Sequence, residues 1–133
     1  MRTDEEIVRE LERATTGLLF MSESDYPVEV FRLEGAEGLT HDLLRRKAGA
    51  DGEAAVVVQS VEDFFRVAAG EQEWKGAAEL ETARRYQALV GLLKSALEDV
   101  RVYRVGEINI GVYVVGRSPA GNWLGVSTRV VET

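Results

Sequence analysis

The sequence predicts a domain in which helices pack on a β-sheet, an α/β or α+β fold of two or three layers. An apolar stripe at helical spacing runs through residues 77–98, a continuous apolar run of strand length occupies 54–59, and three strand-like segments follow one another at the end. With 133 residues, of which 45% are hydrophobic, the chain can bury one core and is too short for two comfortable domains. We therefore expect one domain over residues 1–133.

The first expected element is a helix. Thr3 followed by Glu6 has the pattern of a capping box, and Gly17 is a typical residue for the helix end. Apolar residues between them recur on one helical face: Ile7, Leu11, Ala14 and Leu18. A strand of about six residues should follow, ended by the turn-rich segment 34–38. Its apolar residues are Val28, Val30, Phe31 and Leu33.

The middle of the chain predicts two short helices with a strand between them. Thr40 can cap the first helix, over 41–48, and Gly49 marks its end. The strand 54–59 is expected in the middle of the sheet, because a continuous apolar run is typical of a strand covered on both faces. Ser60 can then cap one or two turns. These turns carry two aromatic side chains, Phe64 and Phe65.

The longest helix is expected over 77–98, followed by three antiparallel strands. The predicted core-facing stripe of the helix is Leu80, Ala83, Gln87, Val90, Leu93 and Leu97, with Tyr86 and Leu89 beside it. The strands are expected at 100–105, 108–115 and 123–131. Pro119 and Gly121 suit a hairpin turn before the last strand. Together with the earlier strands between helices, these segments predict a mixed sheet.

Composition indicates a soluble intracellular protein. The chain has no cysteine, so it has no disulfide framework and no thiolate chemistry. The N-terminus lacks the basic and then apolar order of a signal peptide. No apolar stretch approaches the roughly 20 residues of a membrane span. We therefore expect a cytoplasmic protein without a membrane partner.

The net charge of −7 disfavours direct nucleic-acid binding, because affinity for phosphates comes from lysine and arginine. The imbalance is concentrated in residues 1–34, which hold nine carboxylates and four arginines. A field of this sign would steer association with a basic protein, including one that itself binds nucleic acid. The alternative is that the charge only keeps a small protein soluble.

No enzyme signature is found. The glycines of the last third interrupt strands and turns, so they do not form a phosphate-binding loop. His41 is the single histidine and has no second nitrogen or thiolate ligand, which argues against zinc. A Ser-His-Asp arrangement would need His41 to approach Ser22 or Ser24, which nothing in the sequence indicates. We therefore expect no catalytic residues and no cofactor.

An acidic loop interrupts the apolar segment 18–31. Glu23 and Asp25 stand on a short polar loop held at both ends by residues that favour burial, where binding groups are often found. With Glu29, these carboxylates could hold a divalent cation or act as acid and base. Alternatively, Ser22 and Ser24 make local turn hydrogen bonds and the carboxylates are solvated.

The segment Leu-Leu-Phe-Met-Ser-Glu-Ser-Asp-Tyr-Pro-Val-Glu-Val-Phe at 18–31 resembles the signature of the nuclease A inhibitor family. These proteins block a sugar-nonspecific, magnesium-dependent DNA/RNA nuclease. Further segments resemble the family in its order: Phe-Phe-Arg at 64–66, Glu-Trp at 73–74, Glu-Thr-Ala-Arg-Arg-Tyr at 81–86, Val-Tyr-Arg-Val-Gly at 102–106, Val-Tyr-Val-Val-Gly at 112–116 and Val-Val-Glu-Thr at 130–133. The resemblance covers nearly the whole chain.

The resemblance implies an α/β/α sandwich of three layers with a mixed, largely antiparallel sheet, related to plant pathogenesis-related proteins of class 1. It implies a nuclease partner and three contact residues. Glu23 matches an acidic residue that points into the nuclease active site toward its magnesium. Thr133 matches a C-terminal threonine that reaches the same region, and Trp74 matches an aromatic contact. Their neighbours Ser22, Ser24 and Asp25 are included in the predicted partner-binding set.

Two other functions remain open at this point. One is an acidic binding module for a different basic partner, without nuclease inhibition. The other is a small acid–base or metal enzyme built on Glu23, Asp25 and Glu29. For Thr133 the alternative is an ordinary frayed end, and for Trp74 it is a place at the edge of the core.

Overall fold

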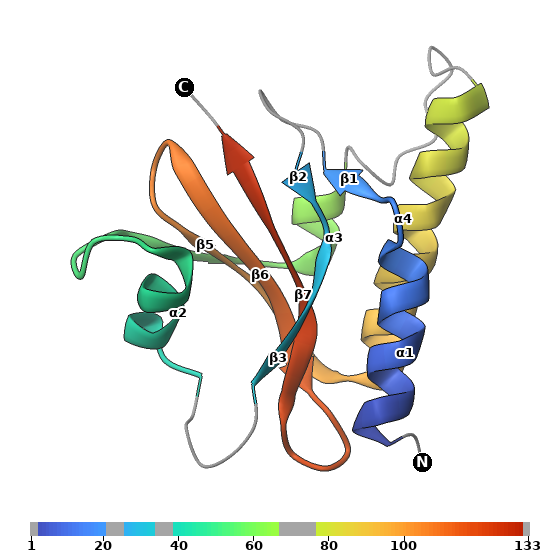
Figure 1. Cartoon of the computed structure of the whole chain (residues 1–133), viewed down its shortest axis with the longest axis horizontal. Helices are drawn as coiled ribbons and strands as arrows, with labels where there is room; N and C mark the ends of the chain where they lie inside the picture. The colour runs from blue at the N-terminus through green and yellow to red at the C-terminus, as the bar shows by residue number, and fades with distance from the viewer. Residues whose placement is uncertain (1–2, 21–25, 34–38, 67–76, 132–133) are drawn as a thin grey trace.

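The computed structural model describes residues 3–20, 26–33, 39–66 and 77–131 (Figure 1). It contains a five-stranded sheet of order β3-β7-β6-β5-β4 and a small sheet formed by β1 and β2. The elements are α1 (Asp4–Thr15), β1 (Leu19–Phe20), β2 (Tyr26–Pro27), β3 (Glu29–Leu33), α2 (His41–Ala48), β4 (Val56–Gln59), α3 (Val61–Phe65), α4 (Ala77–Ala96), β5 (Glu98–Val105), β6 (Asn109–Arg117) and β7 (Trp123–Val131). No helix in these described ranges is long and apolar enough to cross a membrane.

The predicted meander is confirmed: β5, β6 and β7 are consecutive antiparallel neighbours. β3 adds to β7 at one edge and β4 adds to β5 at the other, and both pairs are also antiparallel. The expected mixture of parallel and antiparallel pairs is therefore not seen among the described strands. α2 lies between β3 and β4 along the chain, but these strands end on opposite edges, so this crossover creates no parallel pair.

The helix ends follow the local signals that predicted them. The Thr3 side chain accepts a hydrogen bond from the Glu6 amide at 3.2 Å, and the Thr40 side chain accepts one from the Leu43 amide at 3.1 Å. Gly49 closes α2 in the left-handed region, with φ of 68°. These caps satisfy amides that have no partner inside the helix, which is why short sequence patterns locate them.

The expected central position of the strand 54–59 is wrong. β4 forms the edge of the main sheet, and within the described residues it pairs with β5 alone. The side chains of Val57 and Val58 are 55% and 46% exposed. An apolar run is compatible with either position, because strand order depends on which distant segments pair, and the run itself carries no information about that.

The predicted core stripe of the long helix is rotated. Gln87 is exposed in α4, whereas Tyr86 and Leu89, expected beside the stripe, are 2% and 0% exposed. The predicted stripe residues Ala83, Leu93 and Leu97 are buried, and Tyr86, Leu89 and Ala96 complete the buried side. Tyr86 anchors this rotation, because its ring contacts Phe20 and Phe65 and its hydroxyl donates to the Leu19 carbonyl at 2.6 Å.

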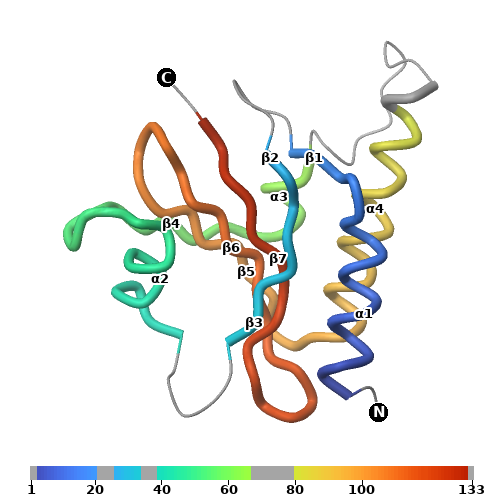
Figure 2. The backbone as a smooth tube through the Cα atoms, in the orientation of Figure 1, coloured from blue at the N-terminus to red at the C-terminus, as the bar shows by residue number. Residues whose placement is uncertain are grey.

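The main sheet has a helix on each side (Figure 2). We call the side of Ile110, Val112 and Val114 the helix-rich face, since α1, α3 and α4 pack there. The helices contribute to this core through Ile7, Leu11, Phe65, Leu89 and Leu93. We call the opposite side, that of Tyr113 and Val115, the α2 face. There α2 contributes Leu43, Leu44 and Ala48 to a smaller core.

Candidate functional site

The predicted partner-binding residues lie outside the described ranges: Ser22, Glu23, Ser24, Asp25, Trp74 and Thr133. Their predicted roles therefore stay predictions. The flanking elements, however, are described, and they show where each of the three segments is attached to the fold. The segment 21–25 lies between β1 and β2, 67–76 lies between α3 and α4, and 132–133 follows β7.

The two strands that flank residues 21–25 pair with each other and are attached to the main sheet. Leu19 is paired with Pro27 and Phe20 with Tyr26 in an antiparallel ladder. The carbonyl of Pro27 accepts a hydrogen bond from the Thr128 hydroxyl of β7 at 3.1 Å. This bond joins the flank of the acidic segment to the strand that leads to Thr133.

An aromatic cluster attaches the same flank to α3 and α4. The Phe20 ring stacks on Phe64 with centroids 4.9 Å apart, and it makes an edge contact with Phe65 at 6.1 Å. A second edge contact joins Phe20 to Tyr86 of α4 at 5.9 Å. Edge and offset contacts are the favoured arrangements of aromatic rings. The packing therefore ties β1 to the two helices that flank residues 67–76.

The described flanks of all three segments gather at one end of the molecule (Figure 1). β1, β2, the last residues of β7 and the start of α4 lie there, whereas the start of α1 and the β6–β7 turn lie at the opposite end. Segments that are far apart in the sequence thus enter and leave the fold on the same side. For β7 the pairing explains this, because it runs antiparallel to β3 and its last residues therefore lie beside the strand start that follows β2.

Two exposed apolar side chains belong to the same end. Ile108 is 59% exposed in the turn between β5 and β6, and Leu19 of β1 is 45% exposed. The turn stands beside the end of β7, since Asn109 pairs with Val131. The sequence predicted a strand over 108–115 that includes Ile108, whereas β6 begins at Asn109. Gly106, with φ of 105°, was the local sign that a turn precedes it.

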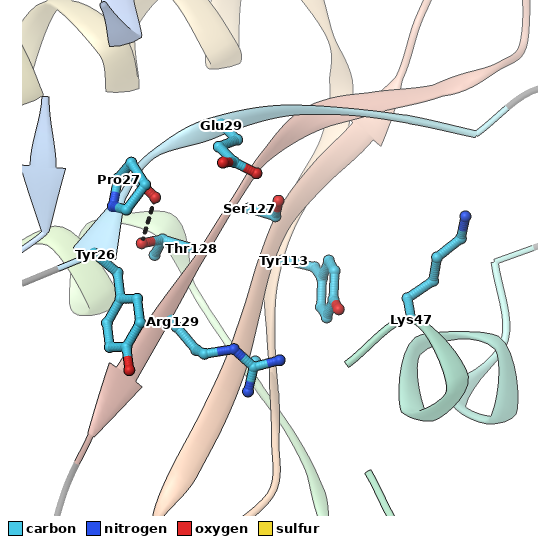
Figure 3. Close-up of a pocket in the computed structure, with 9 residues that line it drawn as sticks. Tyr26, Pro27, Glu29, Lys47, Tyr113, Ser127, Thr128 and Arg129 are labelled. Atoms are coloured by element: carbon cyan, nitrogen blue, oxygen red, sulfur yellow. Dashed lines mark hydrogen bonds between the residues drawn. The ribbon is translucent and has the colours of Figure 1, made fainter. Parts of the chain in front are cut away.

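A pocket of about 300 Å³ opens on the α2 face, next to this end (Figure 3). Strands β2 and β3 form one wall, α2 forms the other, and β6 and β7 form the floor. Its polar side chains include Tyr26, Glu29, Lys47, Tyr113, Ser127 and Arg129. Of these, the sequence analysis singled out Glu29 alone. The available signal was the run of three polar residues, Ser127, Thr128 and Arg129, that interrupts an otherwise apolar strand.

The tyrosines of the two faces are held in their neutral form. Burial raises the pKa of the Tyr113 hydroxyl, and the positive charge of Arg129 opposes that shift. Burial also raises the pKa of Tyr86. Both hydroxyls therefore keep their proton at neutral pH; that of Tyr86 donates to Leu19, and that of Tyr113 can donate to a ligand.

Metal binding finds no support in the described part of the chain. Within these ranges, no three His, Asp or Glu side chains are close enough together to hold a metal ion. Of the three carboxylates that could hold a cation, Glu29 lies within the described residues, whereas Glu23 and Asp25 lie outside them.

The fold and these features define a class: a small α/β protein with a candidate partner-binding end. A family model described as nuclease A inhibitor-like protein matches residues 5–133, nearly the whole chain. The chain therefore belongs to the nuclease A inhibitor-like family, and the resemblance seen in its motifs is confirmed. A search of the curated proteins finds no match to the chain.

Proposed function

We propose that this protein is a stoichiometric inhibitor that occludes the active site of a magnesium-dependent, sugar-nonspecific nuclease. The family match over residues 5–133 carries the proposal. The gathering of three segment flanks at one end supports it, because a contiguous surface needs the segments that form it to emerge on the same side. In this proposal the protein binds and blocks a partner and performs no reaction of its own.

The proposed mechanism is substrate mimicry by Glu23. A metal-dependent nuclease receives a phosphodiester oxyanion beside a hard cation, and a carboxylate is a good ligand for the same place. Glu23 would occupy the site without offering a bond to cleave. Thr133 would approach the same region, and Trp74 would add an aromatic contact of the kind enriched in interface hot spots. Ser22, Ser24 and Asp25 would line the edge of this contact.

The attachment of the Glu23 segment favours such a role. Its flanks are tied to β7 by the Thr128–Pro27 hydrogen bond and to α3 and α4 by the Phe20 contacts. A binding group on fixed supports loses less conformational freedom on association, so more of the contact energy appears as affinity. Ile108 and Leu19 would extend the contact with apolar surface.

We also propose that the layers correspond to the α/β/α sandwich of the class 1 pathogenesis-related proteins. The packing of α2 on one face and of α1, α3 and α4 on the other supports this. Superposition of an experimentally determined structure on a member of that class would test the correspondence. A different strand order would reject it.

The test of function is inhibition of a magnesium-dependent, sugar-nonspecific nuclease by the purified protein. Glu23→Ala should weaken inhibition by about 2 kcal/mol, or about thirtyfold, as expected of a central contact. Glu5→Ala is the matched control: it removes the same charge at the opposite end, from an exposed ion pair with Arg32 that contributes little. Equal inhibition constants for the two variants would show that Glu23 does not mimic the substrate.

A second candidate is an acidic module for a different basic partner, favoured by the net charge of −7 alone. This function predicts no inhibition of any such nuclease, together with salt-sensitive binding to a basic protein. The inhibition assay therefore separates the two candidates directly.

A further inference from the structure

The pocket on the α2 face carries chemistry that the proposed inhibition does not use. Figure 3 shows the guanidinium of Arg129 between the side chains of Tyr26 and Tyr113. The volume of about 300 Å³ lies at the lower end of the range for small-molecule sites. The pocket is therefore large enough for a small ligand and places a fixed cation beside it.

The backbone of α2 positions the guanidinium. The Nη2 atom of Arg129 donates to the carbonyl of Ala48, the last residue of α2, at 2.9 Å. A guanidinium has five N–H donors, and this is its one hydrogen bond within the described ranges. The other donors are thus available to a ligand. Their planar arrangement suits an oxyanion that accepts two parallel hydrogen bonds.

Gly111 lets α2 approach the sheet closely enough for this contact. It pairs with Arg129 in the β6–β7 register. A Cβ atom at this position would lie 2.8 Å from Cβ of Ala48 and 3.4 Å from Cε2 of Tyr113. Any larger residue would push α2 outward or displace the Tyr113 ring, so the geometry around Arg129 depends on this glycine.

The remaining polar groups define the kind of ligand. The neutral Tyr113 hydroxyl is a donor, and Lys47 places a second positive charge on the α2 wall. Lys47 has no ion-pair partner in the part of the chain that the structure describes. Glu29 supplies one carboxylate from the opposite wall (Figure 3), where it can accept hydrogen bonds from hydroxyl or amino groups. Two cations beside hydroxyl donors match a dianion better than a single carboxylate.

We propose that this pocket binds a small phosphate monoester. The phosphate contacts Arg129 and Tyr113, Lys47 on the α2 wall adds attraction at longer range, and the rest of the ligand lies against Tyr26 and Glu29. The protein as a whole carries a charge of −7, which repels anions. Binding must therefore come from these local donors, and it requires no nuclease.

The test is titration of the isotopically labelled protein, at constant ionic strength, with inorganic phosphate, adenosine 5′-monophosphate and acetate. We expect the two phosphates to shift amide resonances of β2, β6 and β7 around the pocket. The nucleotide should bind more tightly than inorganic phosphate, because its sugar and base add contacts to Tyr26 and Glu29. Acetate, with one charge and two oxygens, should bind more weakly than either.

Arg129→Gln should weaken phosphate binding about tenfold or more, as expected when a charged hydrogen-bond donor is lost. Lys47→Gln, at an exposed position of α2, should weaken it by a smaller factor of about three. Arg9→Gln is the matched control, since it removes the same charge from an exposed position of α1, which packs on the other face. Thermal unfolding of Arg129→Gln shows whether loss of the Ala48 contact unfolds the protein, and Lys47→Gln tests the site independently of that contact.

Three results would overturn the proposal. One is the absence of resonance shifts with both phosphate and the nucleotide. Another is acetate binding as tight as phosphate binding, which would define a carboxylate site instead. The third is an equal loss of affinity in Arg9→Gln and Arg129→Gln, which would indicate diffuse attraction. Because the assay contains no nuclease, each result leaves the proposed inhibition untouched.

Discussion

The two faces of the main sheet are closed by very different amounts of helix. On the helix-rich face, α1, α3 and α4 enclose a core that includes Leu89 and Leu93, both fully buried. On the other face, α2 has 8 residues and leaves a pocket at its end. One sheet thus places most of its packing on one side and exposed polar side chains on the other.

The alternation of side chains along β7 explains the difference. Val126 and Val130 point into the helix-rich face, whereas Ser127 and Arg129, between them, point to the α2 face. Covering this polar pair with apolar side chains would cost its hydration. The short α2, which is closed by Gly49, leaves the pair at the edge of the pocket. The period of two in β7 thus places apolar side chains on the helix-rich face and polar side chains on the α2 face.

Truncation of a fully buried leucine should destabilise the two faces by different amounts. Leu89→Ala on the helix-rich face should lower the free energy of unfolding by about 4 kcal/mol, and Leu44→Ala on the α2 face by about 2.5 kcal/mol. The reason is that α4 is held by several elements and cannot move into the cavity, whereas the short α2 can. Urea unfolding would measure both values. A loss at Leu44 equal to that at Leu89 would show that the α2 face is just as rigid.

A smaller effect contrasts the two buried tyrosines at alkaline pH. Both pKa values are raised by burial, and that of Tyr86 is shifted further than that of Tyr113. Above about pH 10, the unfolded chain loses the phenolic proton while the folded protein keeps it, so stability falls as pH rises, by up to about 1.4 kcal/mol per pH unit for each tyrosine.

Denaturant unfolding between about pH 9 and 11 would test the contrast. Tyr86→Phe should flatten the decline in unfolding free energy more than Tyr113→Phe. If Tyr113→Phe flattened the decline more, the hydroxyl on the α2 face would be the more strongly buried of the two. Tyr86→Phe should also lower stability at neutral pH by about 1 kcal/mol, because its hydrogen bond to Leu19 is lost.

The smallest effect should not distinguish the faces at all. Gly17 after α1 and Gly49 after α2 have φ values of 69° and 68°, and a Cβ at either position would meet nothing within 4 Å. Alanine should therefore cost about 1 kcal/mol at each, from backbone strain alone. Thermal unfolding would measure both losses. A much larger loss at Gly49 would mean that the end of α2 is supported by contacts beyond its backbone.

Much of the secondary structure could be predicted because its signals are local. Thr3, Thr40 and Ser60 cap helices α1, α2 and α3 through their own side chains, and the meander of β5, β6 and β7 follows from alternation and short turns. The errors arose where a distant contact decided the outcome. β4 lies at an edge of the sheet instead of its centre, and the buried side of α4 includes Tyr86, which contacts Phe20.

For the candidate site, too, local motifs were predictive and contacts between distant residues were missed. The sequence motifs indicated the family and pointed to Glu23, Trp74 and Thr133, whose contacts stay predictions. The pocket was missed, because Tyr26, Lys47 and Arg129 come from three elements far apart in the chain and no local pattern links them.

Local sequence patterns were enough to predict helix ends, the segments of the meander and the family that the chain resembles. These depend on neighbours within a few residues, or on motifs read in order. The strand order, the rotation of α4, the common end of the three segment flanks and the position of Arg129 were visible only in the folded chain. Each of these is set by pairing and packing between distant residues, which the free energy of the whole fold selects and no single segment encodes.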